Sequence, residues 1–194
     1  MSKIILASSS VYRKELLERL IPKFEIISPN VDESQIKGED AKTTAQRLAL
    51  IKAERISLEN KDAFVIGSDQ TAQFNNVQIK KPSNYPDALD QLLLLSGKVV
   101  YFYSAVCVVQ SNSQIKHKAI ETIEVKYKKI TRSEAELYLK YEKPIGCLGC
   151  IKSEGLGISL LEYVKSSDPT AIIGMPLISL SKIFNSLKIK FHGK

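Results

Sequence analysis

The strongest constraint on the fold is an alternation of short apolar strand patterns with amphipathic helix patterns. Strand patterns cover 3–7 (KIILA), 23–29 (KFEIISP) and 63–70 (AFVIGSDQ), and helix patterns cover 11–20 and 43–58. Alternation of this kind is typical of an α/β protein. The chain has 194 residues, enough for one sizeable core or two closely joined lobes.

Turn and cap signals delimit the later elements. An asparagine pair within 73–79 predicts a hairpin, because asparagine tolerates the positive φ of such turns. A proline near its start and a glycine after its end delimit a helix within 85–97, and the Thr131–Glu134 pair predicts a capping box that opens a helix at 131–142. The remaining expected elements are strands at 99–110, 115–130 and 158–166 and a helix at 175–187.

The junction after the first strand places a cation in the first turn of a helix. Arg13 is locally unfavourable there, since a helix N-terminus carries partial positive charge and favours anions. An anion bound by the free N–H groups and the hydroxyls of Ser8, Ser9 and Ser10 would turn this penalty into a charge-assisted pair. The alternative is a serine N-cap with a solvated arginine. This stretch by itself leaves both interpretations open.

Further charged residues lie where a catalytic or metal site is expected. Lys52 lies on the apolar stripe of the 43–58 helix, so it needs a counter-charge unless its head reaches solvent. Asp69 is expected at the carboxyl end of a buried strand, where α/β sheets usually place their ligands. With Glu33 and Asp32 of the preceding polar loop it could supply a magnesium site, although acidic loop residues are more often merely solvated.

Composition narrows the class of protein. The net charge of +7 suggests a polyanionic partner, but no block of five or six basic residues is present, which argues against nucleic acid. No apolar run approaches the ~20 residues that span a bilayer, and the start lacks the apolar region of a signal peptide, so a cytoplasmic protein without membrane contact is expected. Phosphate-loop, dinucleotide-binding and serine-nucleophile motifs are also absent.

Several motifs together resemble one family. They are LASSSVYRKELL, VDE, RLALIKAE, VIGSDQ, KKP, LSG and SEGLGISLLE…IIGMPL, in the order and spacing of Maf-like nucleotide pyrophosphatases. The resemblance runs from residue 4 to about 184. It implies one domain over 1–194 with the α/β fold of the inosine-triphosphate pyrophosphatases: a mixed, strongly bent sheet flanked by helices, with two lobes around a deep cleft.

The resemblance also implies a reaction and a set of site residues. Members of the family hydrolyse a nucleoside triphosphate to the monophosphate and diphosphate with a divalent metal, here Mg²⁺, Mn²⁺ or Co²⁺. Asp69 matches the proton acceptor, and Glu33 matches a carboxylate that would hold the metal together with Asp69. The groups expected around the triphosphate are Arg13, Lys52, Lys81, Ser8 and Ser10.

Three positions distinguish the subfamilies, here Tyr12, Gln70 and Glu154. They resemble the residues of the 7-methyl-GTP subfamily. Tyr12 could stack against the positively charged base of that nucleotide. Glu154 could accept hydrogen bonds from the N–H groups of the base. The alternatives are a dTTP/UTP or broad-specificity pyrophosphatase, and a weakly catalytic nucleic-acid-binding or cell-division regulatory protein on the same scaffold. Departures from the family at Lys80, Leu148 and Cys150 bear on the base preference. Because relatives are often dimers, a homodimer is one expected assembly.

Overall fold

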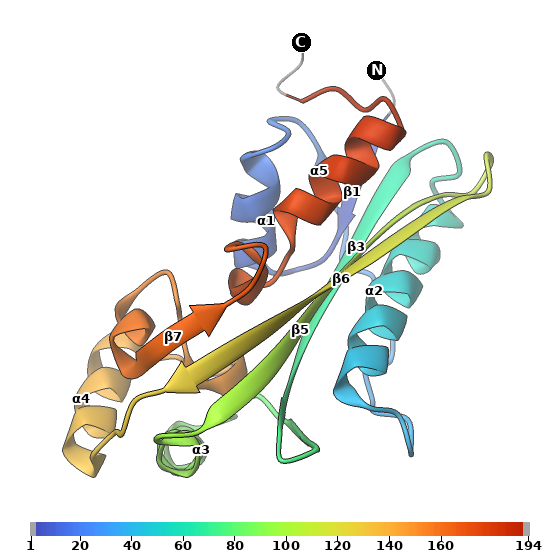
Figure 1. Cartoon of the computed structure of the whole chain (residues 1–194). Coiled ribbons are helices and arrows are strands. Elements are labelled where there is room, and N and C mark those ends of the chain that lie inside the picture. Colours follow the sequence, from blue (N-terminus) through green and yellow to red (C-terminus); the bar gives the residue numbers. More distant parts are fainter. Residues whose placement is uncertain (1–2, 192–194) are drawn as a thin grey trace. The chain divides into compact units, whose positions relative to one another are not determined.

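The computed structural model describes residues 3–191, which form one mixed sheet with helices on its faces (Figure 1). The strands are β1 (Ile4–Ala7), β2 (Glu25–Ile26), β3 (Phe64–Phe74), β4 (Val77–Ile79), β5 (Val99–Gln110), β6 (Ile115–Tyr127) and β7 (Leu161–Lys165). The α-helices are α1 (Val11–Glu18), α2 (Ala41–Ser57), α3 (Tyr85–Leu95), α4 (Arg132–Glu142) and α5 (Leu177–Ser186). Short 3₁₀ turns η1, η2 and η3 occupy Leu148–Cys150, Leu156–Leu160 and Ala171–Ile173.

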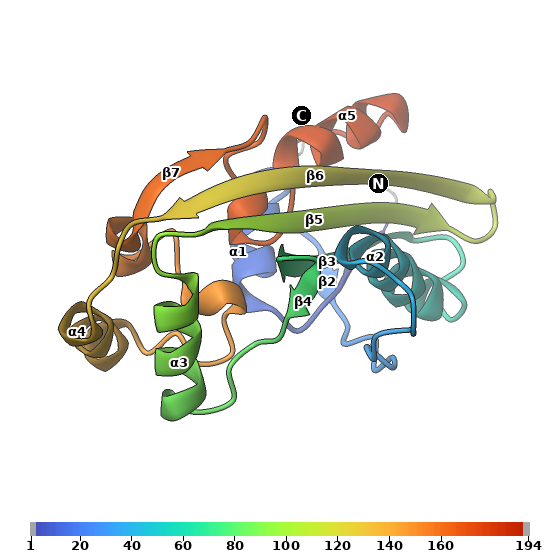
Figure 2. The ribbon, with the colours of Figure 1, turned by 60° about the horizontal axis from the view of Figure 1, so that its bottom comes forward.

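The order of hydrogen-bonded strands is β2-β1-β3-β5-β6-β7, and β4 pairs with β3. β1 is parallel to both β2 and β3, whereas the β3–β4 and β6–β7 pairs are antiparallel. The long strands β5 and β6 lie side by side (Figure 2). This mixed sheet flanked by helices confirms the predicted α/β class.

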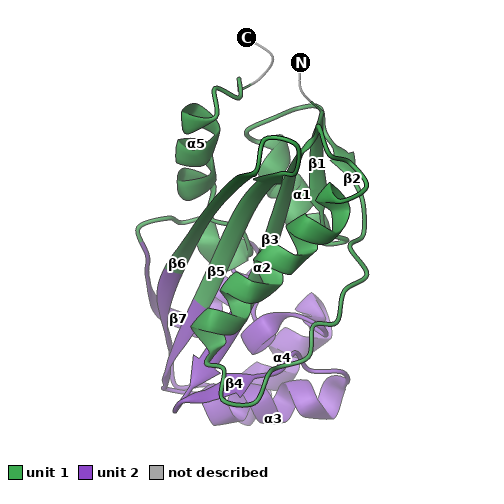
Figure 3. Cartoon of the chain, turned by 90° about the vertical axis from the view of Figure 1, so that its right-hand side faces the viewer, with its two compact units in different colours: residues 1–70, 103–121, 167–194 green, residues 71–102, 122–166 purple. Residues whose placement is uncertain are grey.

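The chain divides into two compact units (Figure 3). Unit 1 comprises 1–70, 103–121 and 167–194, and unit 2 comprises 71–102 and 122–166. Strands β3, β5 and β6 each pass from one unit into the other.

Unit 1 has a buried apolar cluster on each face of its sheet. Neighbouring residues of β1 go to different clusters, Leu6 to one and Ile5 to the other, as the two-residue period of a strand requires. Helices α1 and α5 cover the face of Leu6, to which Leu17 and Phe184 contribute, and the alanine-rich side of α2 covers the other face. The small alanines let α2 approach the sheet closely, which matters for the site.

Unit 2 is built on α3, α4 and the turns η1 and η2, with α3 contacting both α4 and η1. Its buried centre holds Tyr127, whose hydroxyl donates to the carbonyl of Gly149 at 2.8 Å. A Cβ at Gly149 would lie 2.6 Å from that hydroxyl oxygen, so the close contact requires glycine. The family departures Leu148 and Cys150 are buried here too, and the Cys150 thiol donates to Oε1 of Gln91 at 3.2 Å. Burial raises the pKa of the Cys150 thiol to about 12.

Local signals were the most accurate guide to the elements. The capping box of Thr131 and Glu134 is present at the start of α4, and Asn75 and Asn76 have φ values of 48° and 61° in the β3–β4 hairpin. The strand predicted at 23–29 is shorter than expected, because only Glu25 and Ile26 pair with β1.

Candidate active site

The serines after β1 form hydrogen bonds at the N-terminus of α1. Ser10 is the N-cap, its hydroxyl oxygen accepting from the Arg13 amide at 3.4 Å, and the buried Ser8 hydroxyl accepts from the Ser10 amide at 3.1 Å. The serine N-cap is therefore confirmed. The solvated arginine that accompanied this interpretation is wrong, since the Arg13 side chain is only 12% exposed. Its Nη2 lies 3.9 Å from Oδ1 of Asp69, and its Nε donates to the carbonyl of Gly174 at 3.1 Å.

Lys52 is the buried cation of this site. Its side chain is 4% exposed, and Nζ lies 2.6 Å from Oδ1 of Asp69 and 2.8 Å from Oε1 of Glu33. The counter-charge that the sequence required is thus supplied by two carboxylates, and Lys52 does not reach solvent. Glu33 itself is largely exposed, at 57% of its side chain.

A glycine sets the distance between α2 and β3. A Cβ at Gly67 would lie 2.1 Å from the Ala49 carbonyl oxygen and 2.8 Å from the Ala53 amide nitrogen. Only glycine permits this approach of helix backbone to strand. Because Lys52 stands between Ala49 and Ala53 on α2, the approach delivers its amine to Asp69, two residues beyond Gly67.

Asp69 lies within β3 and not at its end, which corrects the expected position. The strand continues to Phe74 because its second half pairs with β4 from Ala72 onward. The neighbouring strand β1 does stop short, its last paired residue Ala7 facing Gly67. Asp69 therefore lies just past the carboxyl end of β1, where the serines and Arg13 begin, and its side chain is 8% exposed.

The loop that carries Glu33 is fastened to α2 by ionic contacts. Arg47 donates from Nε and Nη2 to the Glu39 carboxylate at 2.8–3.0 Å and from Nη2 to the Ser34 carbonyl at 3.1 Å. The side-chain hydrogen bond from Arg47 lowers the pKa of Glu39, and the backbone hydrogen bond from Ser34 lowers that of Asp32. These contacts hold the residues on both sides of Glu33.

The side-chain amide of Gln70 is hydrogen-bonded to the backbone of η3. Nε2 donates to the carbonyls of Ala171 and Ile172, both at 2.9 Å. Tyr12, another predicted specificity residue, lies on α1 in the same unit and is half-buried.

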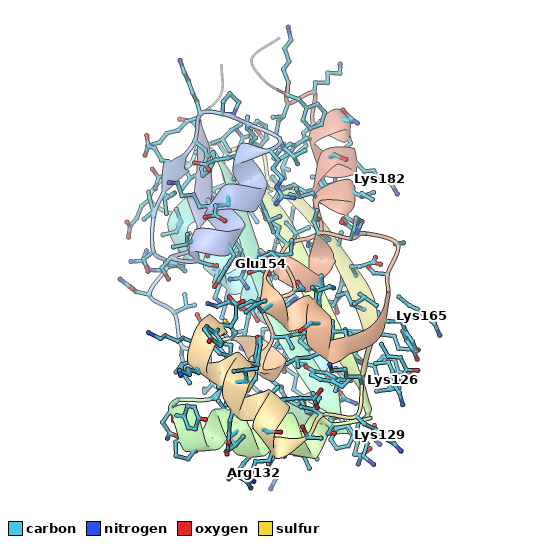
Figure 4. The ribbon with its side chains drawn as sticks, turned by 90° about the vertical axis from the view of Figure 1, so that its left-hand side faces the viewer. Lys126, Lys129, Arg132, Glu154, Lys165 and Lys182 are labelled. Carbon is cyan, nitrogen blue, oxygen red and sulfur yellow. The ribbon has the colours of Figure 1, made fainter. Side chains whose placement is uncertain are left out.

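The remaining predicted residues belong to unit 2, where each is exposed. Lys81 precedes the buried Pro82, whose carbonyl accepts from the Gly146 amide at 3.0 Å. Glu154, labelled in Figure 4, accepts from the Ser153 hydroxyl at 3.3 Å. The structure thus brings Arg13, Glu33, Lys52 and Asp69 together in unit 1 and places Lys81 and Glu154 in the other unit.

Some basic side chains of unit 2 lie beside acidic ones. Lys165 lies 3.1 Å from Glu124, and Lys128 lies 3.5 Å from Glu134. Lys126, labelled in Figure 4 with other cations of this unit, donates to the carbonyl of Gly97.

The carboxylates of Glu33 and Asp69 both contact the Lys52 amine, so their oxygens lie close to one point. Oxygen ligands arranged in this way suit a hard divalent cation. Within residues 3–191, no group of three or more His, Cys, Asp or Glu side chains could hold a metal. Two carboxylates completed by substrate phosphates and water are nevertheless the usual way in which proteins bind Mg²⁺. The residues present fit that arrangement.

A family model described as Maf-like protein matches residues 3–187. The chain belongs to the Maf-like protein family. Its relatives include proteins named 7-methyl-GTP pyrophosphatase. That of Cupriavidus metallidurans is 44% identical over 178 residues, 92% of this chain and 89% of that protein. Those of Cupriavidus pinatubonensis and Polaromonas sp. are each 42% identical, over 98% and 94% of this chain and 96% and 84% of theirs.

Among solved structures, the Ham1 protein of Staphylococcus aureus matches with a TM-score of 0.46 and 13% identity, covering 64% of this chain and 71% of that one. No helix of this Maf-like chain within residues 3–191 combines the length and apolarity needed to cross a membrane.

Sequence reasoning missed the residues that support this Maf-like site. Gly67 and Ser68 stand in the sequence as parts of the VIGSDQ motif and Gly174 as part of IIGMPL, and no pattern marks Asp168. Gly67 gave a usable signal, because a glycine inside a buried strand pattern often marks close approach of another backbone. The contact of Arg13 with Gly174 joins residues 161 apart, so no local pattern could announce it.

Proposed function

We propose that this chain is a nucleoside triphosphate pyrophosphatase that hydrolyses 7-methyl-GTP to 7-methyl-GMP and diphosphate. The single observation that carries the proposal is the buried carboxylate of Asp69, held by Lys52 at 2.6 Å and faced by Arg13 at 3.9 Å. A carboxylate with two adjacent cations suits a reaction that must both activate water and neutralise phosphate. The name shared by the relatives supports the choice of nucleotide.

In the proposed reaction, water attacks the α-phosphorus of the nucleotide. Its oxygen bonds to phosphorus, the bond to the bridging oxygen breaks, and diphosphate leaves with that oxygen. Asp69 accepts the proton of the water. Arg13, Lys52 and Lys81 stabilise the negative charge that moves onto the leaving diphosphate, with Ser8 and Ser10 at the triphosphate end of the site.

Glu33 and Asp69 would hold a divalent cation, Mg²⁺, Mn²⁺ or Co²⁺, which supplies charge neutralisation at the phosphates when bound. Lys52 contacts Oε1 of Glu33 and Oδ1 of Asp69, so a cation between the two carboxylates would compete with its amine for these oxygens. A triphosphate oxygen is a suitable new partner for that amine, because it offers the same charge-assisted hydrogen bond. The carboxylates can then face the cation while Lys52 faces the substrate.

Base preference is assigned to contacts from Tyr12 and Glu154. N7-methylation makes the purine cationic, and the ring of Tyr12 offers it a negative face. Glu154 would accept from the N1–H and the exocyclic amine of guanine, a donor pair that thymine lacks. We propose that residues 1–194 act as one catalytic domain.

The test is diphosphate release from 7-methyl-GTP, GTP, CTP, UTP and dTTP, each with Mg²⁺, Mn²⁺ and Co²⁺. The wild type should turn over 7-methyl-GTP best, and Asp69→Asn should lose that activity with every metal. Glu154→Gln should reduce the 7-methyl-GTP to UTP ratio. A wild type that prefers dTTP or UTP would retain the reaction and refute the base assignment, and release from no nucleotide would refute the reaction.

A further inference from the structure

The Arg13 guanidinium is anchored to the backbone of one turn. Its Nε donates to the carbonyl of Gly174 at 3.1 Å, which directs the guanidinium so that Nη2 lies 3.9 Å from Asp69. Gly174 has a φ of 137°, a conformation that L side chains rarely adopt. The direction of this arginine therefore depends on where the turn that ends in Gly174 is held.

Two residues of β3 hold that turn. Ser68 and Gln70 flank Asp69, and the two-residue period of a strand puts both on the face opposite to Asp69. The buried Ser68 hydroxyl shares its hydrogen between the carbonyls of Ala105 at 2.8 Å and Gly174 at 3.1 Å. Gln70 donates both amide hydrogens to consecutive carbonyls of η3, three and two residues before Gly174.

The far side of the turn is fixed by a buried carboxylate. Asp168 is 1% exposed, and its Oδ1 accepts from the amide and hydroxyl of Thr170 at 2.9 and 2.6 Å. Its Oδ2 accepts from the amide of Ile178 in the first turn of α5 at 2.6 Å. Because the turn is tied to α5 on one side, the bonds from β3 decide its position relative to Asp69.

Gln70 has no amide hydrogen left for a nucleotide in this arrangement. An amide nitrogen carries two hydrogens, and each has a carbonyl partner at 2.9 Å. If this nitrogen donated to a base instead, one of these bonds would break and a carbonyl of η3 would lose its donor, which is unfavourable.

We propose that Gln70 is a positioning residue for Arg13 that acts through the turn 171–174 and does not read the base with its amide nitrogen. The inference rests on the proposed function and changes the part that Gln70 plays in it. Loss of the two hydrogen bonds leaves Ser68 as the remaining described hydrogen bond from β3 to this turn, which shifts the Gly174 carbonyl and misdirects the guanidinium. All nucleotides present the same triphosphate to Arg13, so the effect is the same for every base.

The decisive variant is Gln70→Met, which keeps the length of the side chain and removes both donors. We expect kcat to fall by about 10²-fold for 7-methyl-GTP, GTP and UTP alike, the size of effect that a displacement of about 1 Å can produce. In an Arg13→Ala background the same change should cost little more. Gln110→Met is the matched control, because Gln110 also donates its amide to a backbone carbonyl, that of Asp62. It should leave kcat unchanged.

A second measurement does not depend on turnover. The Arg13 Nε–H gives a ¹H–¹⁵N signal that Arg13→Lys identifies, and in the wild type its hydrogen bond should slow exchange with water. Gln70→Met should accelerate that exchange and Gln110→Met should not. Unchanged exchange, a changed ratio between nucleotides, or a full additional loss in the Arg13→Ala background would each overturn the inference. If no nucleotide is hydrolysed by the wild type, the proposed function fails, whereas the exchange result still decides whether Gln70 holds Arg13.

Discussion

Gly67→Ala tests whether the close approach of α2 to β3 builds the site. A Cβ at Gly67 would lie 2.1 Å from the Ala49 carbonyl oxygen and 2.8 Å from the Ala53 amide nitrogen. Both are backbone atoms of a helix and cannot rotate away as a side chain could. Real Cβ contacts are essentially never shorter than 3.0 Å, so α2 must move from β3 by about 0.9 Å, the difference between 2.1 and 3.0 Å.

Two consequences follow from this movement. Overpacking of this kind costs about 1–3 kcal/mol of folding free energy, and a clash with backbone belongs at the upper end of that range. Lys52 travels with the helix, so its Nζ leaves the 2.6 Å contact with Asp69. A displacement of about 1 Å at a catalytic group can reduce activity by about 10²-fold. We expect both losses in the same variant.

Urea unfolding and diphosphate release from 7-methyl-GTP measure the two effects. Gly38→Ala is the control, because Gly38 has a φ of 86° with nothing within 4 Å of an added Cβ. That change costs about 1 kcal/mol or more of backbone strain without moving α2, so stability should fall while activity stays. Wild-type activity in Gly67→Ala would show that the placement of Lys52 does not depend on this contact. Wild-type stability would contradict the steric argument itself.

Three further predictions concern other parts of the chain. Because Arg47 lowers the pKa of Glu39 below its ordinary 4.5 in the folded state, this carboxylate adds stability above that pH and loses it as the pH falls. Glu39→Gln should therefore flatten the acid limb of a plot of unfolding free energy against pH, and an unchanged limb would contradict the pairing. Burial raises the pKa of Cys150 to about 12, so iodoacetamide at pH 8 should label the half-buried Cys147 first by peptide mapping, and equal labelling would refute this. Thr131→Ala should lower the unfolding free energy by about 1 kcal/mol in urea through loss of the N-cap of α4, and no change would discount the capping box.

Features governed by neighbouring residues could be predicted from the sequence. The capping box of α4 and the asparagine turn after β3 are set by side chains within three residues of the backbone groups they serve. The buried stripe of α2 follows from helical periodicity. Because Lys52 lies on that stripe, the sequence indicates that its charge needs a partner. The sequence also pointed to Asp69 and Glu33 as carboxylates of interest.

Contacts between distant residues were beyond such reasoning. The end of β3 was misplaced because the strand pattern at 63–70 and the hairpin at 73–79 were predicted as separate elements, whereas β3 runs through both as one strand. For Arg13 the sequence offered an anion or solvent, and the structure gives it Asp69 and the carbonyl of Gly174. The family resemblance proposed that Lys81 and Glu154 serve the same site, and this stays a prediction.

The measurement that tests the central claim most directly is hydrolysis of 7-methyl-GTP in H₂¹⁸O with mass analysis of both products. Attack of water on the α-phosphorus predicts one ¹⁸O in 7-methyl-GMP and none in diphosphate, with Asp69→Asn giving neither product above background. Label in the diphosphate would place the attack on the β-phosphorus, and labelled orthophosphate would place it on the γ-phosphorus. Either result would contradict the proposed chemistry.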